Sequence, residues 1–287
     1  MAATSSRSQL SRRNSEVGLG ALIGGKFTDA HVECDGRTWA VHRVIVCNRS
    51  NWFDKAFGGG MKEAAEKKVT IHGMPSAHVD WLLRYIYGGD GMLEDTGHLS
   101  MNPFVAYCVA HRLGDYFDMD DLCTAAIMSI HRNLNSAIRF FQSGKDQISE
   151  EYFRAEVGVS RALFYEEFFE GVGMADGMEY ENAESLRKSF DEFVTRTQYL
   201  VLECHIFHAF LDTNEAFAAR ILRLLSGEFR SGTMPLVRIF PTACSKCRQL
   251  KDDMSGHFAQ VTDKTSGARR ERYLKGTCSD CFQQEDI

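Results

Sequence analysis

One stretch of the chain decides the fold: Phe27-Thr28-Asp29-Ala30-His31-Val32-Glu33-Cys34-Asp35-Gly36-Arg37-Thr38-Trp39-Ala40-Val41-His42. Between Ala30 and Cys34 apolar and polar side chains alternate, and a period of two is typical of a strand with one buried face. The next pair, Asp35-Gly36, supplies the two positive-φ positions of a tight hairpin turn. Trp39 and Val41 continue the return strand. The stretch therefore predicts a β-hairpin.

Helical patterns take over after the hairpin. Short helices are expected over residues 42–47 and 50–57, with Ser50 as the N-cap of the second, and residues 68–71 are expected to form a third short strand. Three longer segments then repeat apolar residues at helical spacing: Val79, Leu82, Leu83 and Ile86; Val105, Val109, Leu113 and Tyr116; and Leu122, Ala126 and Ile130. Gly88-Gly89 ends the first of these helices. A small sheet followed by helical hairpins is an α+β fold.

The 287 residues divide into four regions. Residues 1–25 are expected to be a disordered leader, residues 26–135 the α+β domain, residues 136–232 a mainly α-helical region, and residues 233–287 a tail with paired cysteines. Aromatic residues at helical spacing in the third region predict a helical core. The glycines between residues 171 and 177 predict a loop within it.

Charge and cysteine usage narrow the functional class. A net charge of −6 and a pI near 5.9 argue against a chain that wraps nucleic acid or coats an anionic membrane. No apolar run approaches the roughly 18 residues that span a bilayer.

Five of the nine cysteines are isolated among apolar residues, as buried thiols are. Without an export signal, a reducing compartment is expected, either the cytoplasm or the nucleus. A mitochondrial presequence is the alternative for the leader, because three arginines precede its first acidic residue, Glu16.

The order of these elements, with the residues that carry them, resembles the BTB/POZ domain. The resemblance rests on Phe27 to Val32, Trp39 to Ile45, Ser50 with Phe53, Val69 to Ile71, Leu82 to Gly88, and Val105 to Asp115 with Leu122 beyond. It covers residues 26–135, under half of the chain. It implies the BTB fold and a non-catalytic domain that self-associates or binds other proteins. The helical region and the cysteine-paired tail resemble, more loosely, an arrangement common in fungal BTB proteins.

The resemblance also offers recognition residues. In some BTB domains the acid and the base that match Asp29 and Arg43 line a charged pocket near the dimer interface. The alternative is a buried pair that fixes strand against helix, because an uncompensated buried charge is costly. His42 lies at the same junction. No partnered nucleophile or acid has a motif near it, so we expect a hydrogen-bonded core residue and not a catalytic base.

A second set of residues carries an expected partner. Met61-Lys62-Glu63 resembles the hydrophobic-x-Glu motif with which BTB adaptors of cullin-RING ubiquitin ligases contact the cullin. Met61 is then the apolar anchor and Glu63 the polar contact, on a loop loosened by Gly58 to Gly60. The alternative is a plain surface loop. The partners implied are a homo-oligomer through the BTB domain and a cullin scaffold.

The strongest chemical signal outside that domain is a pair of CxxC motifs, Cys244-x-x-Cys247 and Cys278-x-x-Cys281. Two residues between cysteines let both thiolates face one point, so each pair supplies half of a tetrahedral shell. Four thiolates in a reducing compartment favour structural zinc. Redox-active motifs or free thiols are the alternatives, but redox CxxC work needs a thioredoxin-like βαβ setting that is absent here.

Two functions remain in competition. The first is an interaction adaptor, including a substrate adaptor of a cullin-RING ubiquitin ligase. The second is a transcription-associated regulator that combines BTB oligomerisation with a zinc module. Residues 242–287 hold eight basic and seven acidic residues, which is not the positive excess that duplex binding needs. Arg12-Arg13-Asn14-Ser15 resembles a basophilic kinase site, so Ser15 is a candidate for phosphorylation. No nucleophile–base pair or open metal site marks an enzyme.

Overall fold

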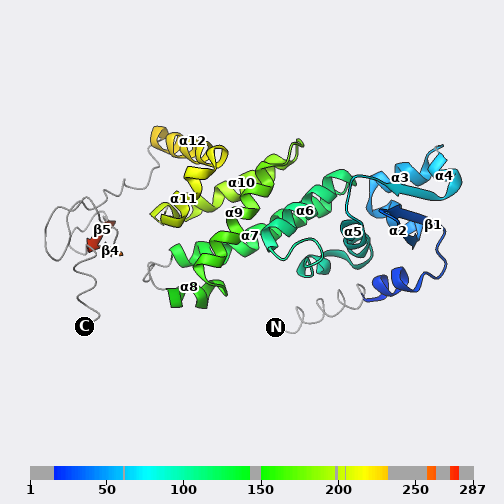
Figure 1. Cartoon of the computed structure of the whole chain (residues 1–287), viewed down its shortest axis with the longest axis horizontal. Coiled ribbons are helices and arrows are strands. Elements are labelled where there is room, and N and C mark those ends of the chain that lie inside the picture. The colour runs from blue at the N-terminus through cyan, green and yellow to red at the C-terminus, as the bar shows by residue number, and fades with distance from the viewer. Residues whose placement is uncertain are drawn as a thin grey trace. The chain divides into compact units, whose positions relative to one another are not determined.

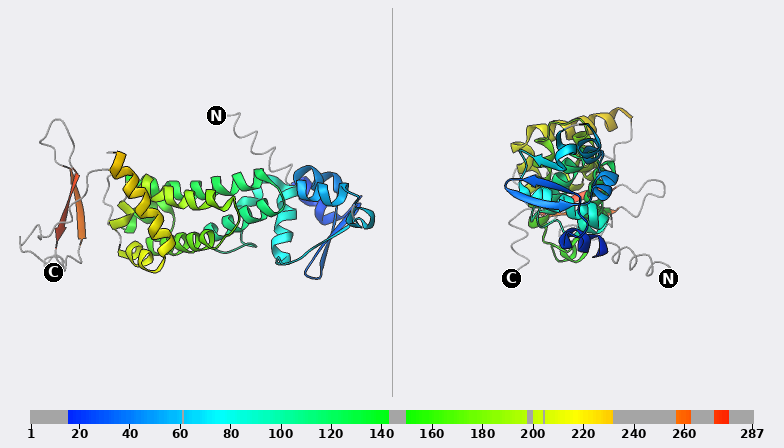
Figure 2. Two further views of the ribbon diagram at one scale, coloured as in Figure 1. Left: turned by 90° about the horizontal axis from the view of Figure 1, so that it is seen from above. Right: turned by 90° about the vertical axis from the view of Figure 1, so that its right-hand side faces the viewer.

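The computed structural model describes residues 16–60, 62–142, 150–197, 200–203, 205–231, 257–262 and 272–277. The chain divides into two units. Figure 1 labels the helices and strands, and Figure 2 draws them from two further sides. Unit 1 is built from residues up to Arg132 together with Glu167–Ser189, and unit 2 from Asn133–Glu166 together with residues from Phe190 onward. Each unit is described by itself below.

Unit 1 begins with a short helix over residues 16–24 and continues into the predicted hairpin. Its further elements are β1 (Ala30–Cys34), β2 (Arg37–Val41), α2 (Arg43–Arg49), α3 (Asn51–Gly58), α4 (Lys62–Glu66), β3 (Lys68–Ile71), α5 (Ser76–Gly88), η1 (Gly89–Glu94) and α6 (Pro103–Tyr116). α7 (Asp120–Gln142), α9 (Arg161–Asp176) and α10 (Ala183–Arg196) contribute residues to both units.

The sheet of unit 1 has the order β2-β1-β3, with β1 antiparallel to β2 and parallel to β3. Asp35 and Gly36 take φ values of 53° and 75° at the turn, which confirms the predicted hairpin. The apolar residues of β1, Ala30, Val32 and Cys34, are all fully buried. One face of the small sheet therefore belongs to the core, as the alternation indicates.

Helix ends in unit 1 follow the predicted signals. The Ser50 hydroxyl accepts a hydrogen bond from the Phe53 N–H at 3.2 Å and so caps α3. The same hydroxyl donates to the carbonyl oxygen of Phe117 at 2.6 Å. At the other end of the core, Gly89 takes a φ of 72° directly after α5, which confirms that the glycine pair ends this helix.

The core of unit 1 is centred on α5. The predicted stripe from Val79 to Ile86 is buried, but so are Trp81 and Tyr85, so α5 is covered on more than one side. These two rings stack at 5.7 Å. Their polar ends are satisfied, since Trp81 Nε1 donates to the Asp95 carbonyl at 3.0 Å and the Tyr85 hydroxyl donates to Asp90 at 3.1 Å. Paired polar ends allow such large side chains to be buried.

Unit 2 comprises the remaining parts of α7, α9 and α10 with α8 (Glu150–Val157), η2 (Leu200–Glu203), α11 (His205–Thr213), α12 (Glu215–Ser231), β4 (His257–Thr262) and β5 (Arg272–Thr277). Its core is aromatic, as the helical spacing predicts: Phe140 meets Phe153 at 5.1 Å, and Phe153 meets Phe164 at 5.6 Å. The Arg161 guanidinium lies 5.0 Å from the Phe153 ring, a cation–π distance.

The predicted loop at residues 171–177 is wrong for most of its length, because α9 continues to Asp176. Gly171 is buried, and the Cys108 Sγ lies 3.7 Å from its carbonyl oxygen. Both residues belong to unit 1. Gly171 therefore lies within α9 at its contact with α6, and not in a turn.

In the tail, β4 and β5 pair antiparallel, with His257 opposite Thr277. Among the described residues no helix has the length and the apolar character needed to cross a membrane.

Candidate interaction surfaces

Asp29 and Arg43 are in contact, but the Asp29 side chain contacts the main chain of Arg43 and not its guanidinium. The Asp29 carboxylate accepts a hydrogen bond from the Arg43 backbone N–H at 2.8 Å. Arg43 is the first residue of α2, whose N-cap His42 offers no side-chain bond, so Asp29 satisfies a free N–H at this helix end. The Arg43 guanidinium instead donates to the Phe57 carbonyl at 3.0 Å. Within the described part of the chain these two side chains form no ion pair.

His42 is fixed by both ring nitrogens. The Tyr87 hydroxyl accepts from the His42 backbone N–H and lies 2.8 Å from Nδ1, while Nε2 lies 2.7 Å from the Lys26 carbonyl. A carbonyl only accepts, so Nε2 carries the proton and Nδ1 accepts from Tyr87. Burial raises the pKa of the Tyr87 hydroxyl. His42 thus ties the segment before β1 to α5, as expected for a hydrogen-bonded structural residue.

The segments that meet near this junction carry exposed apolar side chains, Val17 and Ile23 in residues 16–24, Phe27 before β1 and Val44 in α2, and these four are here called the Phe27 surface. Phe27 is 94% exposed and has a φ of 62°, in the left-handed region that a bulky residue rarely adopts. Its neighbour Lys26 is bonded to His42, and Asp29 is bonded to the start of α2, the helix that carries Val44. Phe27 and Val44 therefore lie at the same end of α2.

Gly18 lets the helix of residues 16–24 pack closely against the end of α5. A Cβ at Gly18 would lie 2.0 Å from the Tyr87 carbonyl oxygen, so only glycine permits this approach to the end of α5. At Gly20, in contrast, a Cβ would meet nothing within 4 Å. The close contact positions Val17 and Ile23, the two members of the Phe27 surface that this helix carries.

Of the two cullin-type residues, Met61 lies outside the described residues and Glu63 lies in the first turn of α4. The expected loop is therefore a short helix at this point. Glu63 is half-buried. Within the described part of the chain its carboxylate makes no hydrogen bond or ion pair, whereas Glu66 of the same helix pairs with Lys62 at 3.5 Å. Glu63 is free to bind another molecule.

A second group of aromatic side chains, the half-buried Trp52 and the exposed Tyr116, lies where α3 meets the end of α6. The Trp52 ring lies 6.1 Å from the Tyr116 ring and 5.1 Å from the buried Phe117 ring. Tyr116 is 46% exposed, although its spacing predicts the apolar face of its helix. Beside them Lys55 pairs with Asp118 at 2.9 Å, and this hydrogen bond lowers the pKa of Asp118. We call Trp52 with Tyr116 the Trp52 surface; the sequence did not indicate it.

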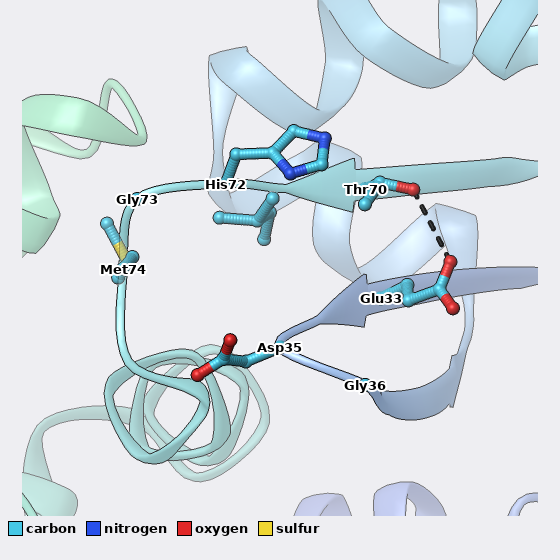
Figure 3. Close-up of a pocket in the computed structure, with 8 residues that line it drawn as sticks. Glu33, Asp35, Gly36, Thr70, His72, Gly73 and Met74 are labelled. Carbon is cyan, nitrogen blue, oxygen red and sulfur yellow. Dashed lines mark hydrogen bonds between the residues drawn. The ribbon is translucent and has the colours of Figure 1, made fainter.

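A pocket of about 390 Å³ opens at the far end of the sheet, between the β1–β2 turn and the residues after β3 (Figure 3). Glu33, Asp35, Thr70 and His72 line it. The Glu33 carboxylate is already engaged by Lys68 and by Thr70, the latter at 3.4 Å, and the hydrogen bond from Lys68 lowers its pKa. Among the described residues no group of three or more His, Cys, Asp or Glu side chains is placed to hold a metal ion.

The remaining predicted site residues lie outside the described residues. These are the four cysteines Cys244, Cys247, Cys278 and Cys281, and Ser15.

Comparisons with known proteins agree on one part of the chain. A family model described as BTB/POZ domain matches residues 22–133. BTB/POZ domain-containing protein 9 of Rattus norvegicus is 27% identical over 124 residues, which is 42% of this chain and 20% of that protein. Kelch repeat and BTB domain-containing protein 8 of Mus musculus is 36% identical over 64 residues, or 22% and 11% of the two chains. Kelch-like protein 22 of Xenopus tropicalis is 27% identical over 90 residues, or 30% and 14%. The match thus spans a fifth or less of each of these relatives.

Proposed function

The chain is a BTB/POZ domain protein, with the domain at residues 22–133, and from this premise we propose that it is a non-catalytic adaptor whose BTB domain both self-associates and docks a cullin-type scaffold. The observation that carries the proposal is the pairing of a BTB match with two groups of apolar side chains at the surface of unit 1, the exposed Phe27 surface and the Trp52 surface, in which Trp52 is half-buried and Tyr116 exposed. Exposed apolar patches on a soluble domain mark interaction sites.

Self-association is assigned to the Phe27 surface. A left-handed backbone at a bulky residue costs about 1–3 kcal/mol, and a phenylalanine left in water forgoes about 1.5–3 kcal/mol of burial energy. Both costs fall on Phe27, at φ 62° and 94% exposure. A second copy that buries this ring would recover the burial energy. The nearby charges, Lys26, Arg43, Asp29 and Glu16, balance in sign, so two such faces do not repel one another.

The test is the mass of the full chain in solution, measured by light scattering after gel filtration. Asparagine tolerates positive φ, so Phe27→Asn removes the ring without straining the monomer, and we expect it to reduce the mass from dimer to monomer. Met101 is exposed to a similar degree, 90%, and lies outside this surface; Met101→Asn is therefore the matched control and should stay dimeric. A monomeric wild type, or a dimeric Phe27→Asn variant, would refute this assignment.

Cullin docking is assigned to Met61 and Glu63 together with the Trp52 surface. α3 carries Trp52 and leads into α4, which carries the unpaired Glu63. An apolar anchor, a free carboxylate and an aromatic pair at the surface are the elements of a hot spot at a protein interface. The resemblance of Met61-Lys62-Glu63 to the cullin-contacting motif names the partner.

The corresponding experiment is retention of the purified full chain by an immobilised cullin N-terminal domain. Charge reversal in Glu63→Lys should reduce affinity at least about tenfold, since an interfacial charge contact is worth about 2 kcal/mol or more. Glu66→Lys changes the same charge in the same short helix and should leave affinity within about twofold. Absence of binding by the wild type, or equal effects of the two variants, would remove the cullin from the proposal and leave only self-association.

We further propose structural zinc at Cys244, Cys247, Cys278 and Cys281. The described strands support this, because the open end of the β4–β5 hairpin is the His257–Thr277 pair and Cys278 follows Thr277 directly. In the sequence, the second cysteine pair thus begins directly after the last residue of β5. Bound zinc would supply stability to a segment with few apolar residues.

Metal analysis of the full chain tests this proposal. We expect one zinc per chain and complete loss in the Cys278→Ser/Cys281→Ser double variant. Cys47→Ser, a half-buried cysteine of α2, is the control and should keep its zinc. A wild type without zinc, or a double variant that retains it, would contradict the assignment.

A zinc-bearing tail also supports the second candidate, a transcription-associated regulator. Its test is binding of labelled duplex DNA by the full chain at rising salt. Affinity that falls steeply with salt would favour it, and absent or salt-insensitive binding would eliminate it. A reducing compartment, cytoplasm or nucleus, fits both candidates: Cys34, Cys47, Cys108 and Cys123 of the described residues are free thiols.

A further inference from the structure

The family match ends at residue 133, yet α6 of that domain is bonded along its length to residues 167–189. At its start, the Asn102 amide donates to the Glu167 carbonyl at 3.0 Å and to the Glu170 carboxylate at 2.8 Å. At its end, the Asp115 carboxylate accepts from the Asn182 amide at 2.6 Å. All of these residues belong to unit 1. Bonds at both ends make the later segment a part of the same folded unit.

Between these two anchors lies the imidazole ring of His111. It is 1% exposed. Its Nδ1 lies 2.9 Å from the Tyr180 hydroxyl and its Nε2 3.3 Å from the Ser185 hydroxyl. Both partners come from the connection between α9 and α10 or from the first turn of α10.

The hydrogen bonds define the protonation state of the ring. The Ser185 hydroxyl donates to the Asn182 carbonyl at 2.6 Å, so towards His111 it can only accept. Nε2 therefore carries the proton, and Nδ1 accepts from Tyr180. A second proton, on Nδ1, would turn the Tyr180 hydroxyl towards the Met178 sulfur, 3.3 Å away, which is a weak acceptor.

We propose that residues 178–185 are a proton-sensitive clasp, which holds α6 while the His111 ring is neutral and releases it when the ring is protonated. The charged and titratable groups around the ring are few. Asp115 and Arg112 come from α6 itself, as does Cys108; Cys123 comes from α7, and Tyr180 from the clasp.

Of these groups Asp115 alone favours a charged imidazole, and its Oδ1 already accepts from Asn182. Burial disfavours the imidazolium and, despite Asp115, lowers the pKa of His111 below its ordinary value. Because the pKa of His111 is lowered in the closed state, the unfolded or released state binds the proton more readily. The clasp is therefore closed at neutral pH and loses stability as the pH falls below about 6.5.

Hydrogen exchange of the full chain, read by mass spectrometry, tests the clasp at about pH 7.5 and about pH 5.5, on either side of the ordinary histidine pKa. After correction for intrinsic exchange, amides of residues 177–189 should exchange faster at the lower pH by up to about tenfold, which is the limit for one proton with an ordinary pKa of about 6.5, while those of β1 and β2 stay protected. In His111→Gln, whose amide can donate and accept but not titrate, the acid effect on residues 177–189 should vanish.

Two further variants test whether protonation of His111, and not another effect of acid, releases the clasp. Tyr180→Phe removes the donor that favours the neutral ring, so release should begin at a higher pH than in the wild type. His98→Gln replaces an exposed histidine of the same unit and should leave the midpoint unchanged. Acid release that persists in His111→Gln, or the lack of any release in the wild type, would overturn the proposal. A Tyr180→Phe midpoint at or below the wild-type value would do so as well.

Discussion

The Ser50 hydroxyl makes two hydrogen bonds in unit 1, one to the Phe53 N–H and one to the Phe117 carbonyl oxygen. We therefore expect its removal to lower the free energy of unfolding by more than the loss of one hydrogen bond would. In Ser50→Ala the α3 N-cap is lost, which costs about 1 kcal/mol. The Phe117 carbonyl loses the donor now at 2.6 Å, and an unsatisfied buried acceptor costs about 1–3 kcal/mol. Because Ser50 is 1% exposed, water cannot easily replace the hydroxyl. We expect unfolding of unit 1 to become easier by about 2–4 kcal/mol.

The measurement is urea unfolding of the full chain followed by tryptophan fluorescence. All three tryptophans, Trp39, Trp52 and Trp81, lie in unit 1, so the signal reports this unit by itself. The matched control is Ser100→Ala, which removes one hydroxyl that accepts from the Asn102 N–H at 3.1 Å and should cost about 1 kcal/mol. Equal losses in the two variants would refute the claim that Ser50 serves both the cap and the Phe117 carbonyl.

Two further predictions concern unit 1. In Gly18→Ala the new methyl group would lie 2.0 Å from the Tyr87 carbonyl oxygen, so amides of residues 16–24 should lose hydrogen-exchange protection. Gly20→Ala has open space around it and should raise this protection, because alanine has the higher helix propensity. Similar behaviour of both variants would disprove the close approach. Asp80 is the second case. Burial raises its pKa, but hydrogen bonds from Arg84 and Trp39 outweigh this and lower it. Its contribution to stability is therefore present at neutral pH and is lost as the pH falls from about 4, and urea midpoints measured between about pH 6 and about pH 3 should fall less steeply in Asp80→Asn than in the wild type.

Local signals account for the parts of the fold that the sequence predicted. Asp35-Gly36 sets the hairpin because glycine adopts a positive φ without steric cost and aspartate tolerates one. Ser50 caps α3 because its side chain reaches a backbone N–H three residues on. The third strand, β3, also lies at residues 68–71 as expected. Each of these features depends on a few neighbouring residues.

Contacts between distant residues account for the parts that the sequence did not predict. The bond from Asn102 to Glu167 joins residues 65 positions apart, and no periodicity encodes it. Because glycine is common in turns, its spacing predicts a loop at Gly171, whereas this residue lies inside α9 and its carbonyl oxygen contacts Cys108 of α6. Tyr116 fits the apolar spacing of α6 but lies in its last turn, where the core no longer covers it.

The candidate site shows the same division. The sequence selected Asp29, Arg43 and Glu63 by resemblance, but it did not indicate that Asp29 would bond the backbone of Arg43 and not its guanidinium. It included Phe27 among the residues that carry the resemblance, but it did not indicate that this side chain would be exposed. Exposure and backbone conformation identify this residue, and both are properties of the folded chain.

The two proposed surfaces occupy different helices, the Phe27 surface on α2 with residues 16–24 and the Trp52 surface on α3 and α6. Groups without shared partners contribute additively to binding free energy. Phe27→Asn should therefore leave the affinity for a soluble cullin domain unchanged. On a densely coated surface, however, the same variant should bind more weakly, because a dimer presents two docking sites and gains from effective concentration. If Phe27→Asn weakened binding equally in both formats, the two surfaces would be one, and docking would itself require the dimer.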